Sequence, residues 1–179
     1  MDANYFGAIR AMQAVLPAMR KAGSGLIINC SSIVGRISPP FFGTYTATKH
    51  ALEGYSQALR YEVARFGVDI AIVEPGPFGT GLLGAGKPPA LGEVLDSYGE
   101  LAGVPAAMGA QFAQMLQSEG APDPQWVVDA YLNLAEMPAG KRPIRTVVGI
   151  TWGVDEMNRL TQPIQDRILT EMQLDNVLG

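Results

Sequence analysis

The sequence predicts an α/β fold, in which a parallel sheet of about three strands is flanked by helices. Two short apolar runs, residues 26–30 and 68–73, are bounded by turn residues, as strands buried on both faces are. Between them, residues 44–65 carry apolar side chains at helical spacing and end just before Gly67. Because a long helix joins the two strands, we expect a βαβ unit with a right-handed crossover and parallel strands.

The remaining elements follow from the same kinds of pattern. Helical spacing predicts three further helices and a short apolar run predicts a third strand: helices over residues 5–20, 126–136 and 155–174, and a strand over residues 143–148. Gly and Pro residues indicate a loop over 31–43 and a longer loop, with one or two short helices, over 78–105. A chain of 179 residues is long enough for one core, so we expect a single domain, 1–179.

Composition excludes several classes of function. The formal net charge is −4 and no basic stripe is present, which argues against nucleic acid as a partner. One cysteine, Cys30, and one histidine, His50, leave no internal disulfide and no Cys/His zinc site, and Cys30 is expected to be a small buried residue at a strand end. Neither a signal peptide nor a span of about 20 apolar residues is found, so no membrane segment and a cytoplasmic location are expected.

Three polar residues form a candidate catalytic group. Tyr45 and Lys49 stand four positions apart on the predicted helix, so their side chains share one face. A nearby ammonium favours the phenolate, and a tyrosine whose pKa is lowered from about 10 can exchange a proton with an alcohol or carbonyl. Ser32 follows a predicted parallel strand, where open α/β sheets place their ligands. A Tyr-x-x-x-Lys pair taken alone is also typical of an ordinary surface helix.

Four motifs, taken together, carry a family resemblance. They are Asn4-Tyr5-Phe6-Gly7, Asn29-Cys30-Ser31-Ser32, Tyr45-Thr46-Ala47-Thr48-Lys49 and Glu74-Pro75-Gly76-Pro77. In this order and spacing they resemble the catalytic portion of the short-chain dehydrogenase/reductase family. The resemblance implies a partial Rossmann-like, doubly wound parallel sheet and an oxidoreductase that depends on NAD or NADP. Its substrate would be a small alcohol, ketone or aldehyde, and a hydride would pass between nicotinamide and substrate.

The resemblance also assigns roles to individual residues. Tyr45 would be the catalytic acid–base and would also contact the cofactor. Lys49 would lower the pKa of Tyr45 and bind the nicotinamide ribose, and Ser32 would orient the substrate oxygen. Asn4 would hold a water in the proton relay, although a plain role at the start of a helix is an equal alternative. The segment that packs on the nicotinamide would contain Pro75, Gly76 and Thr80. The helices over 5–20 and 44–65 would pair copies into a homodimer or tetramer.

The chain departs from the family pattern before Asn4. The family's Gly-rich turn and the residue that separates NAD from NADP have no counterpart there, so the resemblance implies a truncated, carboxyl-terminal catalytic portion. Residues 79–84 and 81–87 mimic the G-x-G-x-x-G and G-x-x-x-x-G-K patterns, but the sequence after Gly84 opens no helix and Pro88 replaces the required Ser or Thr. The alternative function is a catalytically silent family member or incomplete gene model that acts at most as an interaction module.

The Leu-containing segment 78–95 has two equal interpretations. Its leucines could line an apolar substrate pocket beneath a lid, which would favour a lipophilic substrate. They could equally cover the core as part of an ordinary loop.

Overall fold

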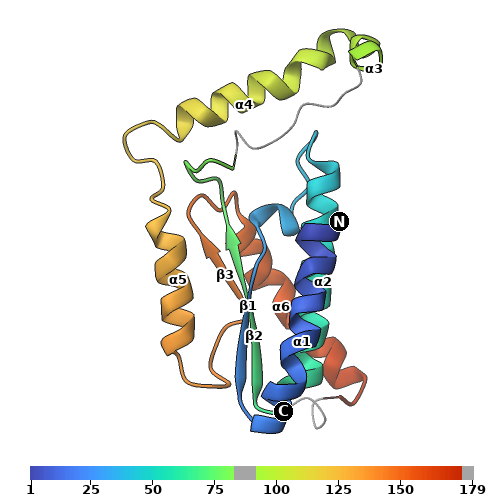
Figure 1. Ribbon diagram of the computed structural model, residues 1–179, viewed down its shortest axis with the longest axis vertical. Coiled ribbons are helices and arrows are strands. Elements are labelled where there is room, and N and C mark those ends of the chain that lie inside the picture. The colour runs from blue at the N-terminus through green and yellow to red at the C-terminus, as the bar shows by residue number, and fades with distance from the viewer. Residues whose placement is uncertain (83–91, 175–179) are drawn as a thin grey trace.

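The structure is a computed structural model and describes residues 1–82 and 92–174 (Figure 1). Its elements, in chain order, are η1 (Asp2–Phe6), α1 (Gly7–Ala22), β1 (Gly25–Cys30), η2 (Ile33–Gly35), α2 (Gly43–Ala64), β2 (Val68–Pro75), α3 (Gly92–Asp96), η3 (Gly99–Gly103), α4 (Val104–Met115), α5 (Gln125–Glu136), β3 (Arg145–Val148) and α6 (Val154–Glu171). The strands form one parallel sheet in the order β1-β2-β3, with Ile27 opposite Ile70 and Ile72 opposite Arg145. The predicted α/β fold, with three parallel strands flanked by helices, is confirmed.

Helices cover both faces of the central strand, β2. Ile70 packs in a cluster with buried residues of α1 and α2, whereas Ala71 and Val73 face α5 and β3 on the opposite side. Successive side chains of a strand point to opposite faces, so a continuous apolar run is buried only where both faces are covered. All four residues 70–73 are fully buried, and the helical layers lie on either side of the sheet in Figure 1.

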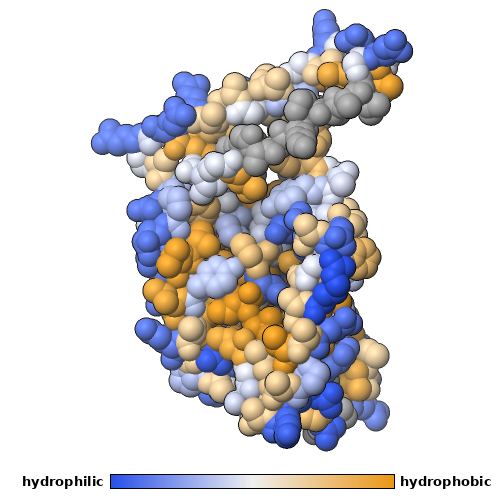
Figure 2. All heavy atoms as spheres, in the orientation of Figure 1, coloured by the Kyte–Doolittle hydropathy of each residue, from blue (hydrophilic) through white to orange (hydrophobic). Residues whose placement is uncertain are grey.

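The burial of β1 differs from the expectation. The strand was expected to be buried on both faces, but residues 25–28 are half-buried and Cys30 is exposed. Within the described residues β1 pairs only with β2, and α5 packs on β2 and β3 rather than over β1. Figure 2 shows hydrophobic residues gathered on the face between α5 and α1, where β1 lies in Figure 1. The prediction that Cys30 is buried was therefore wrong.

Smaller differences concern element boundaries and one helix. The helix expected over 5–20 begins as a π-helical turn, η1, and continues as α1 to Ala22, where Gly23 ends it in a left-handed conformation with φ of 67°. The loop 31–43 contains a short 3-10 turn, η2. Helix α4 was not predicted, although Val104, Met108, Phe112 and Met115 stand at helical spacing, and none of its residues is buried. Two short helices, α3 and η3, occur within the long loop as expected.

Part of that loop, residues 83–91, lies outside the described residues, and with it lie Leu83, Leu91 and the later positions of both glycine patterns. Among the helices that the structure describes, none is long and apolar enough to cross a membrane.

Candidate active site

The carboxyl ends of β1 and β2 bring two of the motifs together. Ser31 N donates to Val73 O at 2.8 Å, which continues the parallel ladder one residue past β1. The Ser32 hydroxyl then donates to Pro75 O at 3.3 Å and accepts from Val34 N at 3.3 Å, so it caps η2 while touching the end of β2. These bonds fix Ser32 at the edge of the sheet where a parallel fold binds ligands.

Helix α2 delivers the other two candidate residues to the same edge. The Lys49 ammonium donates to Cys30 O at 2.8 Å, and its Nζ lies 5.7 Å from the centre of the Tyr45 ring. Tyr45 is half-buried and packs against the cluster that contains Ile33 and Val34 of η2. The structure therefore brings Ser32, Tyr45 and Lys49 together, and the first turns of α2 hold both helix residues over the end of β1.

The electrostatics of Tyr45 run opposite to the expectation. Burial raises the pKa of Tyr45 above its ordinary value, and the hydrogen bond with Ser32 only partly opposes this. Burial also lowers the pKa of Lys49, and the neighbouring Cys30 and Glu53 partly offset this by raising it. The expected lowering of the Tyr45 pKa by Lys49 is absent, because desolvation dominates and the ammonium is directed to a backbone carbonyl. Tyr45 is thus a phenol, a proton donor, at neutral pH.

Asn4 is connected to this group through α2. Its Nδ2 donates to Thr48 Oγ1 at 3.3 Å, and Thr48 Oγ1 donates to Tyr45 O at 2.7 Å. Asn4 lies inside η1, which has no side-chain cap, so the plain helix-start role is not what the structure shows. The side chain instead ties the amino-terminal turn to the segment of α2 that holds Tyr45.

Gly76 joins the site, whereas Thr80 does not. Gly76 N donates to Val148 O at 2.9 Å, and a Cβ at this position would collide with Ile150 O. Only glycine allows β2 to pass so close to the segment after β3. Thr80 is exposed, and its hydrogen bonds stay within residues 78–82.

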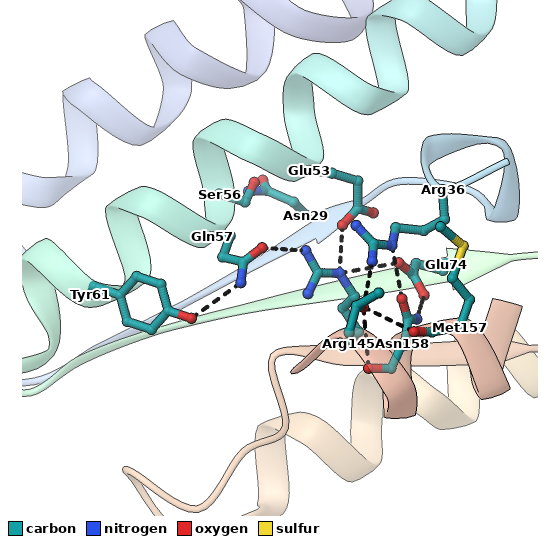
Figure 3. Close-up of polar contacts among 11 residues, drawn as sticks. Asn29, Arg36, Glu53, Ser56, Gln57, Tyr61, Glu74, Arg145, Met157 and Asn158 are labelled. Atoms are coloured by element: carbon teal, nitrogen blue, oxygen red, sulfur yellow. Dashed lines mark hydrogen bonds and ion pairs between the residues drawn. The ribbon is translucent and has the colours of Figure 1, made fainter. Parts of the chain in front are cut away.

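Beneath the site lies a set of buried and half-buried polar side chains that no sequence pattern predicted (Figure 3). We call it the buried polar network: Arg36, Glu53, Glu74, Arg145 and Asn158. Arg145 Nε lies 2.9 Å from Glu53 Oε2 and 3.4 Å from Glu74 Oε1, and the Glu74 side chain is fully buried. The available signals were that Glu74 sits within a strongly apolar strand and that Glu53 follows Lys49 by one helical turn.

Glu74 is the most perturbed acid of this network. Burial and the neighbouring Glu53 raise the pKa of Glu74 to about 8, against the hydrogen bond from Asn158 and the attraction of Arg145 and Arg36. Glu74 is therefore mostly protonated at neutral pH, which reduces the number of charges that the interior must hold.

Comparisons with known proteins agree with this geometry. A family model described as short chain dehydrogenase matches residues 1–88. The 3-ketodihydrosphingosine reductase of Bacteroides thetaiotaomicron is 51% identical over 81 residues, which are 45% of this chain and 30% of that protein. The dehydrogenase/reductase SDR family member 7B of Danio rerio is 43% identical over 76 residues, or 42% of this chain and 25% of that protein. The matched region thus spans less than a third of these curated relatives.

Solved structures cover more of the chain. A short-chain dehydrogenase from Streptomyces avermitilis superposes with a TM-score of 0.64 and 32% identity, over 95% of this chain and 57% of that one. A short-chain dehydrogenase from Burkholderia cenocepacia in complex with NADP has a TM-score of 0.58 and 23% identity, over 96% and 56% of the two chains, and shares the fold. The motifs, the sheet and these relatives agree, and the chain belongs to the short-chain dehydrogenase/reductase family.

Proposed function

We propose that this chain carries the catalytic residues of an NAD- or NADP-dependent oxidoreductase acting on an alcohol/carbonyl pair. The observation that supports this most is the convergence of Ser32, Tyr45 and Lys49 at the carboxyl end of β1, fixed by the bonds to Pro75 O and Cys30 O. Relatives named as reductases and dehydrogenases, one of them in complex with NADP, support the same class of reaction.

Each residue has a distinct task in this proposal. Tyr45, protonated at neutral pH, donates its proton to the carbonyl oxygen when the carbonyl is reduced. Ser32 holds that oxygen with its hydroxyl. A bound nicotinamide would supply the hydride to the carbonyl carbon.

Lys49 and Gly76 fit a bound nicotinamide nucleotide. An ammonium has three N–H donors, and Lys49 directs one of them to Cys30 O, so ribose hydroxyls could accept from the others. Gly76 lets the backbone after β2 lie close to Ile150 without an intervening side chain, and by the family resemblance this segment would pack on the nicotinamide.

We further propose that the substrate is lipophilic. Helix α4 crosses above the carboxyl end of the sheet in Figure 1, and no charged residue occurs between Glu100 and Glu119. The preceding residues Val94, Leu95 and Tyr98 are exposed apolar side chains. A relative named for a 3-keto substrate supports a ketone as the reacting group.

The test is titration of the purified chain with NADPH and NADH, followed by turnover of ketones of increasing alkyl length. Tyr45→Phe should lower kcat by roughly 100- to 10,000-fold while cofactor affinity is kept. Tyr55→Phe removes a hydroxyl from the same helix and should leave kcat unchanged. A folded sample that binds neither cofactor would contradict the proposal and favour the catalytically silent alternative.

A further inference from the structure

The segment that carries Ser32 is joined to helix α6 by one half-buried arginine. Arg36 follows η2 in the connection between Ser32 and Tyr45. Its Nε donates to Asn158 Oδ1 at 2.8 Å, and its terminal nitrogen donates to Thr161 Oγ1 at 2.9 Å, both on α6 (Figure 3). Residues more than 120 positions apart in the sequence therefore hold each other.

Asn158 extends this connection to the end of β2. Its Nδ2 donates to Glu74 Oε2 at 2.5 Å, and Glu74 is the residue directly before Pro75. A guanidinium can only donate, so the amide oxygen of Asn158 must face Arg36 and its NH₂ must face the Glu74 carboxyl. An amide is the side chain that can accept from one neighbour and donate to the other at once.

The two segments at the site are thus joined twice. The direct contact is the bond from the Ser32 hydroxyl to Pro75 O, and the indirect one passes through Arg36, Asn158 and Glu74. The apolar side of the same connection is the packing of Ile33 and Val34 against Val154 at the start of α6.

We propose that Asn158 and Arg36 are positioning residues, which hold the Ser32 segment (residues 31–43) in register with the end of β2 at Pro75 and Gly76. They touch neither substrate nor cofactor in this proposal and act through Ser32. The effect on turnover rests on the proposed function, but the effect on the Ser32 segment does not, and the two are measured separately.

The test removes the amide and then exchanges it with the carboxyl. Asn158→Leu removes both the acceptor for Arg36 and the donor to Glu74, so it should loosen the segment. The double variant Asn158→Asp with Glu74→Gln keeps one amide and one carboxyl with the donor reversed, and should keep the contact. Asn133→Leu, the same change at an exposed position of α5, is the matched control.

Hydrogen exchange of the full chain measures directly how well the amides of the Ser32 segment are protected from solvent. Asn158→Leu should speed exchange of the amides in residues 31–43 by roughly tenfold or more, because a hydrogen bond to a charged group, here the Arg36 guanidinium, is worth at least that factor. The double variant should exchange at the wild-type rate, and Asn133→Leu should not depart from it. Turnover should follow with a loss of roughly 10- to 100-fold in kcat and little change in the KM for cofactor.

Several results would overturn the inference. Unchanged exchange in residues 31–43 for Asn158→Leu would do so, as would a double variant that exchanges as fast as the single one. If Asn158→Leu does not fold, Arg36→Lys serves the same purpose, since a lysine keeps the charge but cannot reproduce the two-point contact of the guanidinium. Wild-type protein without turnover would refute the proposed function alone, because the exchange measurement stands independently.

Discussion

Replacing Arg145 tests whether the buried polar network stabilises the fold. The Arg145 side chain is 6% exposed, pairs with Glu53 and Glu74, and donates from its terminal nitrogen to Gln57 Oε1 at 2.8 Å. Arg145→Met keeps much of the aliphatic volume and removes the charge. Since Glu74, with a pKa of about 8, is mostly protonated at pH 7, the charge left unpaired is chiefly that of Glu53.

Arg145→Met should lower the free energy of unfolding by about 3–5 kcal/mol, the cost of breaking a buried ion pair by removing one partner. Alternatively, the orphaned carboxylate takes up a proton, which costs about 1.4 kcal/mol for each unit between the pH and an ordinary glutamate pKa near 4.3, or about 3.7 kcal/mol at pH 7. The second figure falls to about 1.6 kcal/mol at pH 5.5, so the cost of the substitution should shrink by more than half.

Urea unfolding at pH 7 and pH 5.5 measures both numbers. The control is Arg159→Met on α6, because Arg159 is 71% exposed and lies 3.8 Å from Glu156, also exposed, so its removal should cost less than about 1 kcal/mol at either pH. A decrease in the free energy of unfolding of less than about 1 kcal/mol for Arg145→Met at pH 7, or an equal decrease at both pH values, would contradict the pairing of Arg145 with a buried Glu53 carboxylate.

Three further outcomes are expected. The pKa of Glu74 is raised to about 8 in the folded state, so the folded protein binds this proton more tightly than the unfolded chain does. The contribution of Glu74 to stability should therefore be greatest below about pH 4.5 and should fall as the pH rises toward 8, by at most about 1.4 kcal/mol per pH unit. Glu74→Gln should flatten that fall in a series of thermal melts. Gly76→Ala should destabilise the chain by roughly 1–3 kcal/mol in urea unfolding, since its Cβ would meet Ile150 O, whereas Gly81→Ala, with nothing within 4 Å, should be nearly neutral. Ile72→Ala, at the fully buried centre of β2, should cost about 2–5 kcal/mol in the same assay, and a loss under about 1 kcal/mol would contradict the assigned core.

The candidate site separates what spacing can predict from what it cannot. The four-residue spacing of Tyr45 and Lys49 fixes one helix face, and the position of Ser32 after a strand fixes the sheet edge, so the order of residues along the chain is enough to place the three together. Their protonation could not be predicted in this way, because the pKa of Tyr45 depends on how much water the surrounding η2 segment and α2 exclude.

The existence of strand β1 could be predicted from the sequence, but its burial could not. An apolar run such as residues 26–30 predicts a strand, and the structure has one in β1. Whether both faces are covered depends on the reach of α5, a helix about a hundred positions later, and this left Cys30 exposed. Helix α4 was not predicted, although its larger apolar residues stand at helical spacing, and none of its residues is buried.

Periodicity, turn residues and short spacings act over a few turns of chain, so the amino-acid sequence was enough to predict the parallel βαβ unit and the local motifs. Which charges are buried together depends on long-range packing. Arg36 and Asn158 lie 122 positions apart, and Glu53 and Arg145 lie 92 apart, so no local pattern relates them. Each of these residues alone is typical of a solvated surface. The packing of α6 on β3 and η2, and the contact of Arg145 with α2, remove water from them. Buried charges must then be paired, because an unpaired charge is costly in the interior.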